Sequence, residues 1–156
     1  MNKWDIVDYA KIQSDILKEV FKKIDNKKYK PILYGDYNSD VGYIINSHLL
    51  VIIPQAFNML SLPCEYNSMA IHKLIPSLSD FEKATNYNTV TPHDKLKLRL
   101  IENDNTQVQV NDDYLKYFNL ENEYFSIYIK DRKTPVIFFD EYTDKILGLL
   151  MPVVNY

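Results

Sequence analysis

Residues 111–155 read NDDYLKYFNLENEYFSIYIKDRKTPVIFFDEYTDKILGLLMPVVN, and this stretch decides the fold that we expect. Its apolar residues fall into three segments, which predict β-strands at EYFSIYIK, TPVIFFD and ILGLLMPVV. DDYLKYF predicts a short helix capped by Asn111 or Asp112, and EYTD predicts a turn between the last two strands. A helix followed by three strands therefore forms the last part of the chain.

The same order of elements occurs near the N-terminus. Residues 4–25 predict a helix, because residues suited to a core recur at helical spacing on one face: Ile6, Ala10, Gln13, Leu17, Val20, Phe21 and Ile24. After Pro31, ILYGDY, VGYIIN and HLLVII predict three antiparallel strands. The sequence therefore predicts an α+β fold of two αβββ halves, with antiparallel sheets and with two helices on one face.

Between the two halves the pattern is less regular. KLKLRLI and TQVQVN alternate polar and apolar residues, which predicts a β-hairpin over residues 95–111. AFNMLSL is compatible with a short helix, and prolines interrupt most of the remainder. We expect one domain over residues 1–156, with halves at about 4–60 and 95–156 and an irregular connection at 61–94.

Composition narrows the class of protein. The chain is 46% hydrophobic and 25% charged, as folded domains are, and its apolar runs are shorter than the roughly 18 residues that span a bilayer. Charges in MNKWDIVDYAKIQ argue against a signal peptide, and the single cysteine, Cys64, cannot form an internal disulfide, so we expect a cytoplasmic protein. With only three glycines, a glycine-rich phosphate loop is excluded. Abundant Lys, Asn, Ile and Tyr suggest a low-GC bacterium or its phage.

No pattern typical of an enzyme emerges from the chain. The histidines, His48, His72 and His93, are far apart, and none has a partner at the spacing of a zinc site. Cys64 lacks the context of a nucleophile, and the acidic pairs at 112–113 and 140–141 fit a helix cap and a turn. We therefore expect a protein without catalytic residues, metal or cofactor.

One charged feature remains on the predicted N-terminal helix. Lys11, Lys18 and Lys22 lie within about 40° of one another on the side opposite the apolar face, and Lys27 and Lys28 follow. Asp8 and Asp15 interrupt this row. It is either a local contact for nucleic acid or an ordinary solvated helix face, because the net charge of −3 gives no general basic surface.

The C-terminal stretch resembles the closing segment of the bacterial DNA polymerase sliding clamp family. The resemblance rests on Asn111, Tyr114 and Leu115, then Pro135-Val136-Ile137, then Leu149-Leu150-Met151-Pro152-Val153. A second match to that family consists of Leu33-Tyr34-Gly35, Asn46-Ser47-His48-Leu49-Leu50 and Ile52-Ile53-Pro54-Gln55-Ala56. The family's Asp-Gly-His-Arg turn is Asn-Ser-His-Leu here, and the chain is shorter than half of a normal clamp.

The resemblance implies a clamp-like domain that acts in replication without being an enzyme. It implies that Lys11, Lys18, Lys22, Lys27 and Lys28 face double-stranded DNA. It also implies a groove for the peptides of replication partners, lined by His48, Leu49, Pro54, Leu149, Met151 and Pro152. Because one domain cannot encircle DNA, a processivity factor of this length would be a homo-oligomeric ring. The alternatives are a monomeric phage mimic or inhibitor of the host clamp, and an unrelated α+β accessory protein.

Overall fold

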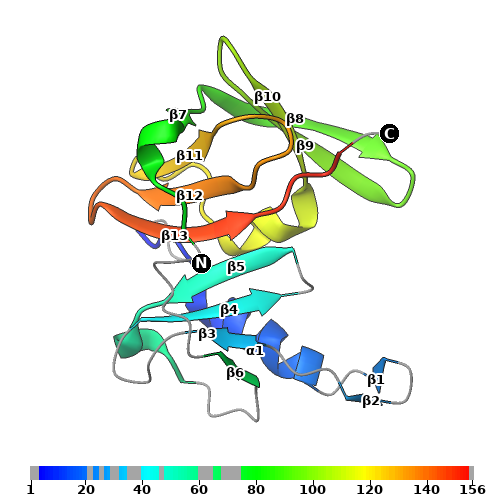
Figure 1. Ribbon diagram of the computed structural model, residues 1–156, viewed down its shortest axis with the longest axis vertical. Helices are drawn as coiled ribbons and strands as arrows, with labels where there is room; N and C mark the ends of the chain where they lie inside the picture. The colour runs from blue at the N-terminus through cyan, green and yellow to red at the C-terminus, as the bar shows by residue number, and fades with distance from the viewer. Residues whose placement is uncertain are drawn as a thin grey trace. The chain divides into compact units, whose positions relative to one another are not determined.

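The computed structural model divides the chain into two compact units (Figure 1). We call Asp8–Pro76 the amino-terminal unit, and Met1–Val7 together with Ser77–Tyr156 the carboxy-terminal unit. The structure describes residues 4–20, 23–24, 27–28, 32–34, 40–45, 48–59, 65–67 and 75–154.

The described residues of the amino-terminal unit form one α-helix and a mostly antiparallel sheet. Their elements are α1 (Tyr9–Val20), β1 (Lys23–Ile24), β2 (Lys27–Lys28), β3 (Ile32–Tyr34), β4 (Val41–Ile45), β5 (Leu49–Ile53), the 3₁₀ helix η1 (Gln55–Phe57) and β6 (Glu65–Asn67). Strands β3, β4 and β5 are antiparallel neighbours, and β6 runs parallel to β3. All five residues of β5 are buried, which explains its unbroken apolar sequence.

Helix α1 is shorter than the predicted helix at both ends. Asp8 is the N-cap of the helix, because its side-chain Oδ1 accepts the Lys11 N–H at 3.1 Å and its backbone oxygen accepts the Ile12 N–H. Residues 4–8 therefore precede the helix, and Lys23–Ile24 form strand β1, so the predicted range of 4–25 is wrong on both sides. Ile12 and Ile16 are buried, as the helical spacing predicted.

The carboxy-terminal unit contains two antiparallel groups of strands. One has the order β10-β9-β8, from β8 (Asn86–His93), β9 (Leu96–Glu102) and β10 (Gln107–Asn111). The other has the order β13-β12-β11-β7, from β7 (Glu82–Lys83), β11 (Phe125–Ile129), β12 (Val136–Asp140) and β13 (Lys145–Leu150). Two 3₁₀ helices, η3 (Leu78–Asp80) and η4 (Asp112–Tyr117), complete the unit.

The core of this unit is formed by aliphatic and aromatic side chains. Phe138 is fully buried, and its ring lies 4.5 Å from that of Phe118 and 5.9 Å from that of Phe125. Val136, Ile137 and other strand residues add to this core. Burial of such side chains is the main force that holds a meander of three strands together.

Several predicted elements of this unit are present and others differ. The hairpin at 95–111, the last three strands and the turn at 141–144 are confirmed. The helix at 112–117 is a 3₁₀ helix, and Asn111 rather than Asp112 caps it by accepting the Asp113 N–H at 3.1 Å. Strand β13 ends at Leu150, and the Val153 N–H donates instead to the backbone oxygen of Gln109 on β10.

The predicted irregular connection at 61–94 is wrong over its last part, where β8 forms. Seven of the eight residues of NYNTVTPH are exposed, so the segment carries no apolar alternation. Its strand structure comes from pairing with β9, in which His93 lies opposite Leu96 and Pro92 opposite Lys97. Since β8 is an edge strand of its sheet, Pro92 is tolerated there.

The α+β class with antiparallel sheets is confirmed. In each unit a helix precedes three consecutive antiparallel strands, namely α1 before β3, β4 and β5, and η4 before β11, β12 and β13. The finer prediction, one clamp-like domain whose two helices share a face, stays a prediction.

Candidate functional site

Four of the five lysines predicted to face DNA belong to two described elements, and the fifth lies outside the described residues. Lys11 and Lys18 are exposed on α1, on the side away from the buried Ile12 and Ile16. Lys27 and Lys28 form β2, which follows α1 in the chain. Lys22 lies outside the described residues.

Carboxylates accompany both described helix lysines. Lys18 Nζ lies 3.8 Å from Asp15 Oδ1, and the side chain of Asp8 caps the helix just before Lys11. An exposed ion pair of this kind contributes about 0–1 kcal/mol to stability, so it can be exchanged for another anion at little cost. The face can contact phosphates through two lysines, and it has no strong net positive charge.

The groove residues predicted from the resemblance fall into two sets, one in each unit. In the amino-terminal unit His48 is exposed, Leu49 is fully buried and Pro54 is half-buried. The three groove residues of the carboxy-terminal unit also differ in exposure: Leu149 is buried, Pro152 is half-buried and Met151 is 45% exposed. Leu49 and Leu149 thus belong to the core, and His48 and Met151 are the members that offer surface to a partner.

Gln13, which the sequence placed on the core face of the helix, organises the surface beside α1. Its Nε2 donates to the backbone oxygens of Tyr9 at 3.1 Å and Phe57 at 2.9 Å, and its Oε1 accepts the Met59 N–H at 2.7 Å. The rings of Tyr9 and Phe57 stack with centroids 5.3 Å apart. This buried amide therefore fixes residues 57–59 against the helix.

Among the described residues of the amino-terminal unit, three large apolar side chains are exposed. Phe57 is 55% exposed, Met59 is 88% exposed, and Leu17 on α1 is also exposed. The sequence suggested only a short helix here, and the long-range bonds of Gln13 could not be inferred from spacing.

Two polar clusters in the carboxy-terminal unit connect elements that are distant in sequence. In the first, Arg99 Nε lies 2.6 Å from Asp112 Oδ1, and an Arg99 amino group donates to the backbone oxygen of Tyr87 at 2.7 Å. The guanidinium thereby joins β8, β9 and η4. Asp112, predicted as a helix cap, is the partner of this arginine.

The second cluster joins β7, β11 and the turn after β12. Tyr128 Oη donates to Glu141 Oε1 at 2.9 Å, and Lys83 Nζ lies 3.3 Å from the same oxygen. Burial, followed by the hydrogen bond and the charge of Glu141, raises the pKa of Tyr128 to about 12. Burial acts to raise the pKa of Glu141, but hydrogen bonds from Tyr128, Ser126 and Lys83 outweigh it and lower that pKa. The phenol thus stays neutral and the carboxylate charged at neutral pH.

The histidines do not assemble into a site in the described part of the chain. His93 Nε2 lies 3.9 Å from Asp94 Oδ2 at the exposed end of the β8–β9 hairpin. His72 and Cys64 fall outside the described residues. Among residues that the structure describes, no group of three or more His, Cys, Asp or Glu is arranged to hold a metal ion. None of the described helices has the length and apolar character needed to cross a membrane.

Comparison with known proteins identifies no relative. No protein-family model, curated protein or solved structure matches the chain. The resemblance to sliding clamps therefore rests on the motif residues of the sequence and stays a prediction.

Proposed function

We propose that this chain is a non-enzymatic, clamp-like replication accessory protein that binds duplex DNA as an oligomer and also binds peptides of replication partners. The observation that supports the proposal is a helix followed by three antiparallel strands in each unit: α1 with β3, β4 and β5, after the short β1–β2 pair, and η4 with β11, β12 and β13. Two residues of the resemblance lie at the boundaries of these elements: Asn111 caps η4 and Pro135 directly precedes β12.

Electrostatics supports loose contact with DNA. Lys11 and Lys18 are exposed on one side of α1, and Lys22, Lys27 and Lys28 follow in the sequence. Lysine binds phosphate as a flexible point charge, which suits a protein that contacts the DNA backbone without reading its sequence. Each phosphate contact adds about 0.9 to the slope of log affinity against log salt concentration, so two lysines account for about 1.8.

Contact with partner peptides would involve residues that remain exposed. Met151 follows β13, and the hydrogen bond from Val153 to Gln109 holds this end of the chain on β10. A flexible thioether on a fixed backbone can adapt to different apolar side chains. On the amino-terminal unit His48 is exposed before β5, where its imidazole can exchange a hydrogen bond with a partner peptide.

The test compares DNA binding of two charge-reversed variants. Fluorescence anisotropy with a labelled 30-base-pair duplex at low salt should give measurable affinity for the wild type. The double variant Lys11→Glu/Lys18→Glu should bind more weakly and with a smaller salt slope. The control Lys95→Glu/Lys97→Glu changes the same charge on the exposed β8–β9 hairpin and should bind as the wild type does. Equal affinity of both variants would refute the assignment of α1 as the DNA-facing helix.

A monomeric mimic of the host clamp is the second candidate. It is favoured by Asp8 and Asp15, which accompany the lysines of α1 and reduce its positive charge. A mimic would stay monomeric and bind no DNA at low salt, yet it would bind host replication proteins. The anisotropy experiment therefore distinguishes the two candidates.

A further inference from the structure

Two exposed tyrosines form a pair at one end of the β11-β12-β13 meander. Tyr124 directly precedes β11, and Tyr142 lies in the turn between β12 and β13. Their ring centroids are 5.2 Å apart with the planes inclined by 57°. Tyr142 is 75% exposed and Tyr124 is 40% exposed, so both rings offer surface to a ligand.

The backbone that carries this pair is held firmly. Asp140 Oδ1 accepts the Tyr142 N–H at 2.8 Å and the Thr143 N–H at 3.3 Å, and Asp140 Oδ2 accepts the Thr143 hydroxyl at 2.8 Å. The Glu141 N–H donates to the backbone oxygen of Tyr124 at 2.8 Å, which joins the turn to the start of β11. Rings on a fixed backbone lose little conformational entropy when they bind a partner.

Carboxylates dominate the surroundings of the pair. Residues 121–124 and 140–145 include Glu121, Glu123, Asp140, Glu141 and Asp144. The lysines of this end are Lys145 and Lys83, and Lys83 is already paired with Glu141. Burial is the main cause of the raised pKa of Tyr128, and the negative charges of Glu141 and Asp144 raise it further.

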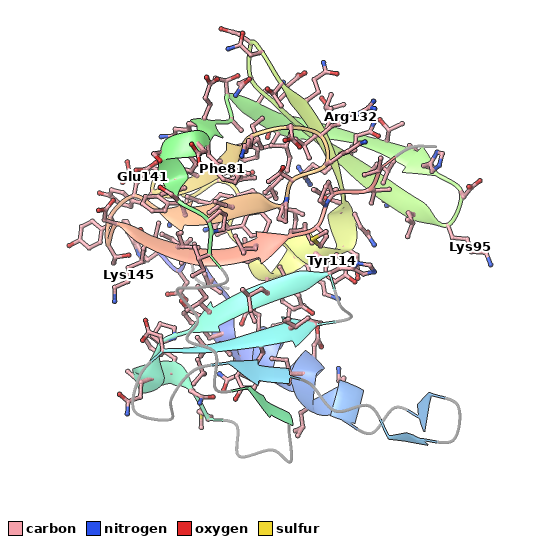
Figure 2. All side chains as sticks on the ribbon, viewed as in Figure 1. Phe81, Lys95, Tyr114, Arg132, Glu141 and Lys145 are labelled. Atoms are coloured by element: carbon pink, nitrogen blue, oxygen red, sulfur yellow. The ribbon has the colours of Figure 1, made fainter. Side chains whose placement is uncertain are left out.

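Three further basic residues of the same meander lie at its other end. Lys130, Arg132 and Lys133 belong to the loop that joins β11 to β12, at the opposite end of this antiparallel pair. Figure 2 shows Glu141 and Lys145 at one end and Arg132 away from them. The end of the meander that carries the tyrosine pair therefore has five carboxylates and two lysines, one of which, Lys83, is paired with Glu141.

We propose that Tyr124, Tyr142 and the adjoining carboxylates form a docking site for a cationic segment of a partner protein, one that presents arginine or lysine. A guanidinium can lie over the exposed face of Tyr142 by a cation–π contact while Glu123 or Asp144 accepts its N–H groups. Single-stranded nucleic acid also stacks on tyrosine, but its phosphates would be repelled by these carboxylates. This site is separate from the α1 lysines and does not depend on the proposed DNA binding.

The test uses the ¹⁵N-labelled full chain and a tetra-arginine peptide, followed by NMR at low salt. Saturable shifts should appear for the amides of residues 123–124 and 140–145. Tyr142→Ala should weaken binding about two- to five-fold, the factor expected for one exposed cation–π contact. Tyr142→Phe keeps the ring and should bind as the wild type does. Val90→Ala removes an exposed apolar side chain of β8 and is the matched control.

Removal of carboxylate charges provides a second test in the same peptide titration. Asp144 has a φ of 59°, a conformation that asparagine also tolerates, so Glu123→Gln/Asp144→Asn removes two charges with little effect on the turn. This variant should lose affinity, and added salt should weaken the wild type. Unchanged affinity of Tyr142→Ala, shifts that do not saturate at these amides, or equal shifts with a twelve-residue oligo-dT would each overturn the proposal.

Discussion

Replacement of Gln13 by leucine should release residues 57–59 from helix α1. Gln13 is buried, and its amide makes three hydrogen bonds, to the backbone oxygens of Tyr9 and Phe57 and to the N–H of Met59. Leucine fills a similar volume but can neither donate nor accept a hydrogen bond. The variant therefore keeps most of the packing and removes the polar link.

The expected loss of stability follows from these bonds. A hydrogen bond contributes about 0.5–1.5 kcal/mol net, and an aromatic stack such as that of Tyr9 with Phe57 adds roughly 0.5–1.5 kcal/mol. Phe57 and Met59 are largely exposed, so water can satisfy the released backbone groups once the segment separates. The three bonds and the stack together amount to about 2–6 kcal/mol, and because water compensates part of this we expect a loss of about 2–4 kcal/mol in the free energy of unfolding.

Two measurements check this expectation. Urea denaturation gives the change in stability, and hydrogen exchange of the Met59 amide, followed by NMR, should become at least about tenfold faster. Gln55→Leu is the matched control, because Gln55 is exposed and should change stability by less than about 0.5 kcal/mol. Equal stability of the two variants together with unchanged exchange at Met59 would show that Gln13 does not hold this segment.

Four further predictions concern the carboxy-terminal unit. Because the pKa of Glu141 is lower in the folded protein, its charge stabilises the fold above the unfolded pKa, and this stabilisation is lost as the pH falls through the folded pKa. Glu141→Gln removes the titrating group, so its melting temperature should fall less steeply than that of the wild type between pH 7 and 3. The same variant should bring the pKa of Tyr128 down from about 12 towards 10, as followed by the NMR shifts of that ring, and an unchanged value would show that burial alone raises it. Arg99→Leu should cost about 1.5–3 kcal/mol in urea denaturation, because it removes a charge-assisted hydrogen bond and leaves the partly buried Asp112 without its partner, and Arg99→Leu/Asp112→Leu should recover part of that loss. Pro92→Thr adds an N–H to an edge strand and should increase self-association above that of the wild type in sedimentation velocity, whereas the same size distribution for both proteins would argue against an edge-protecting role.

The strands of the fold could be predicted where apolar residues run together. LLVII is buried throughout, and VIFFD is buried in its first four residues, so both segments are strongly apolar in sequence. Strand β8 was missed because its side chains are exposed and its structure depends on pairing with β9. The helix was predicted too long, since the capping carboxylate of Asp8 outweighs the apolar periodicity that continues before it.

Surface features could be predicted from the sequence only where all of their residues belong to one helix or strand. Lys11 and Lys18 are exposed, as helical spacing predicted. Burial of Leu49 and Leu149 depends on packing that a motif does not reveal. The contact of Tyr124 with Tyr142 arises because the strand meander returns the chain to the same end of the sheet, and no spacing rule in sequence indicates it.

The mass of the particle in solution, measured by multi-angle light scattering with and without duplex DNA, tests the proposed function most directly. A clamp-like protein that acts as a ring should give a multiple of the 18.4 kDa chain mass, and the multiple should persist or increase when duplex is added. A mass of one chain at every protein concentration, unchanged by DNA at low salt, would contradict the ring and the DNA binding together.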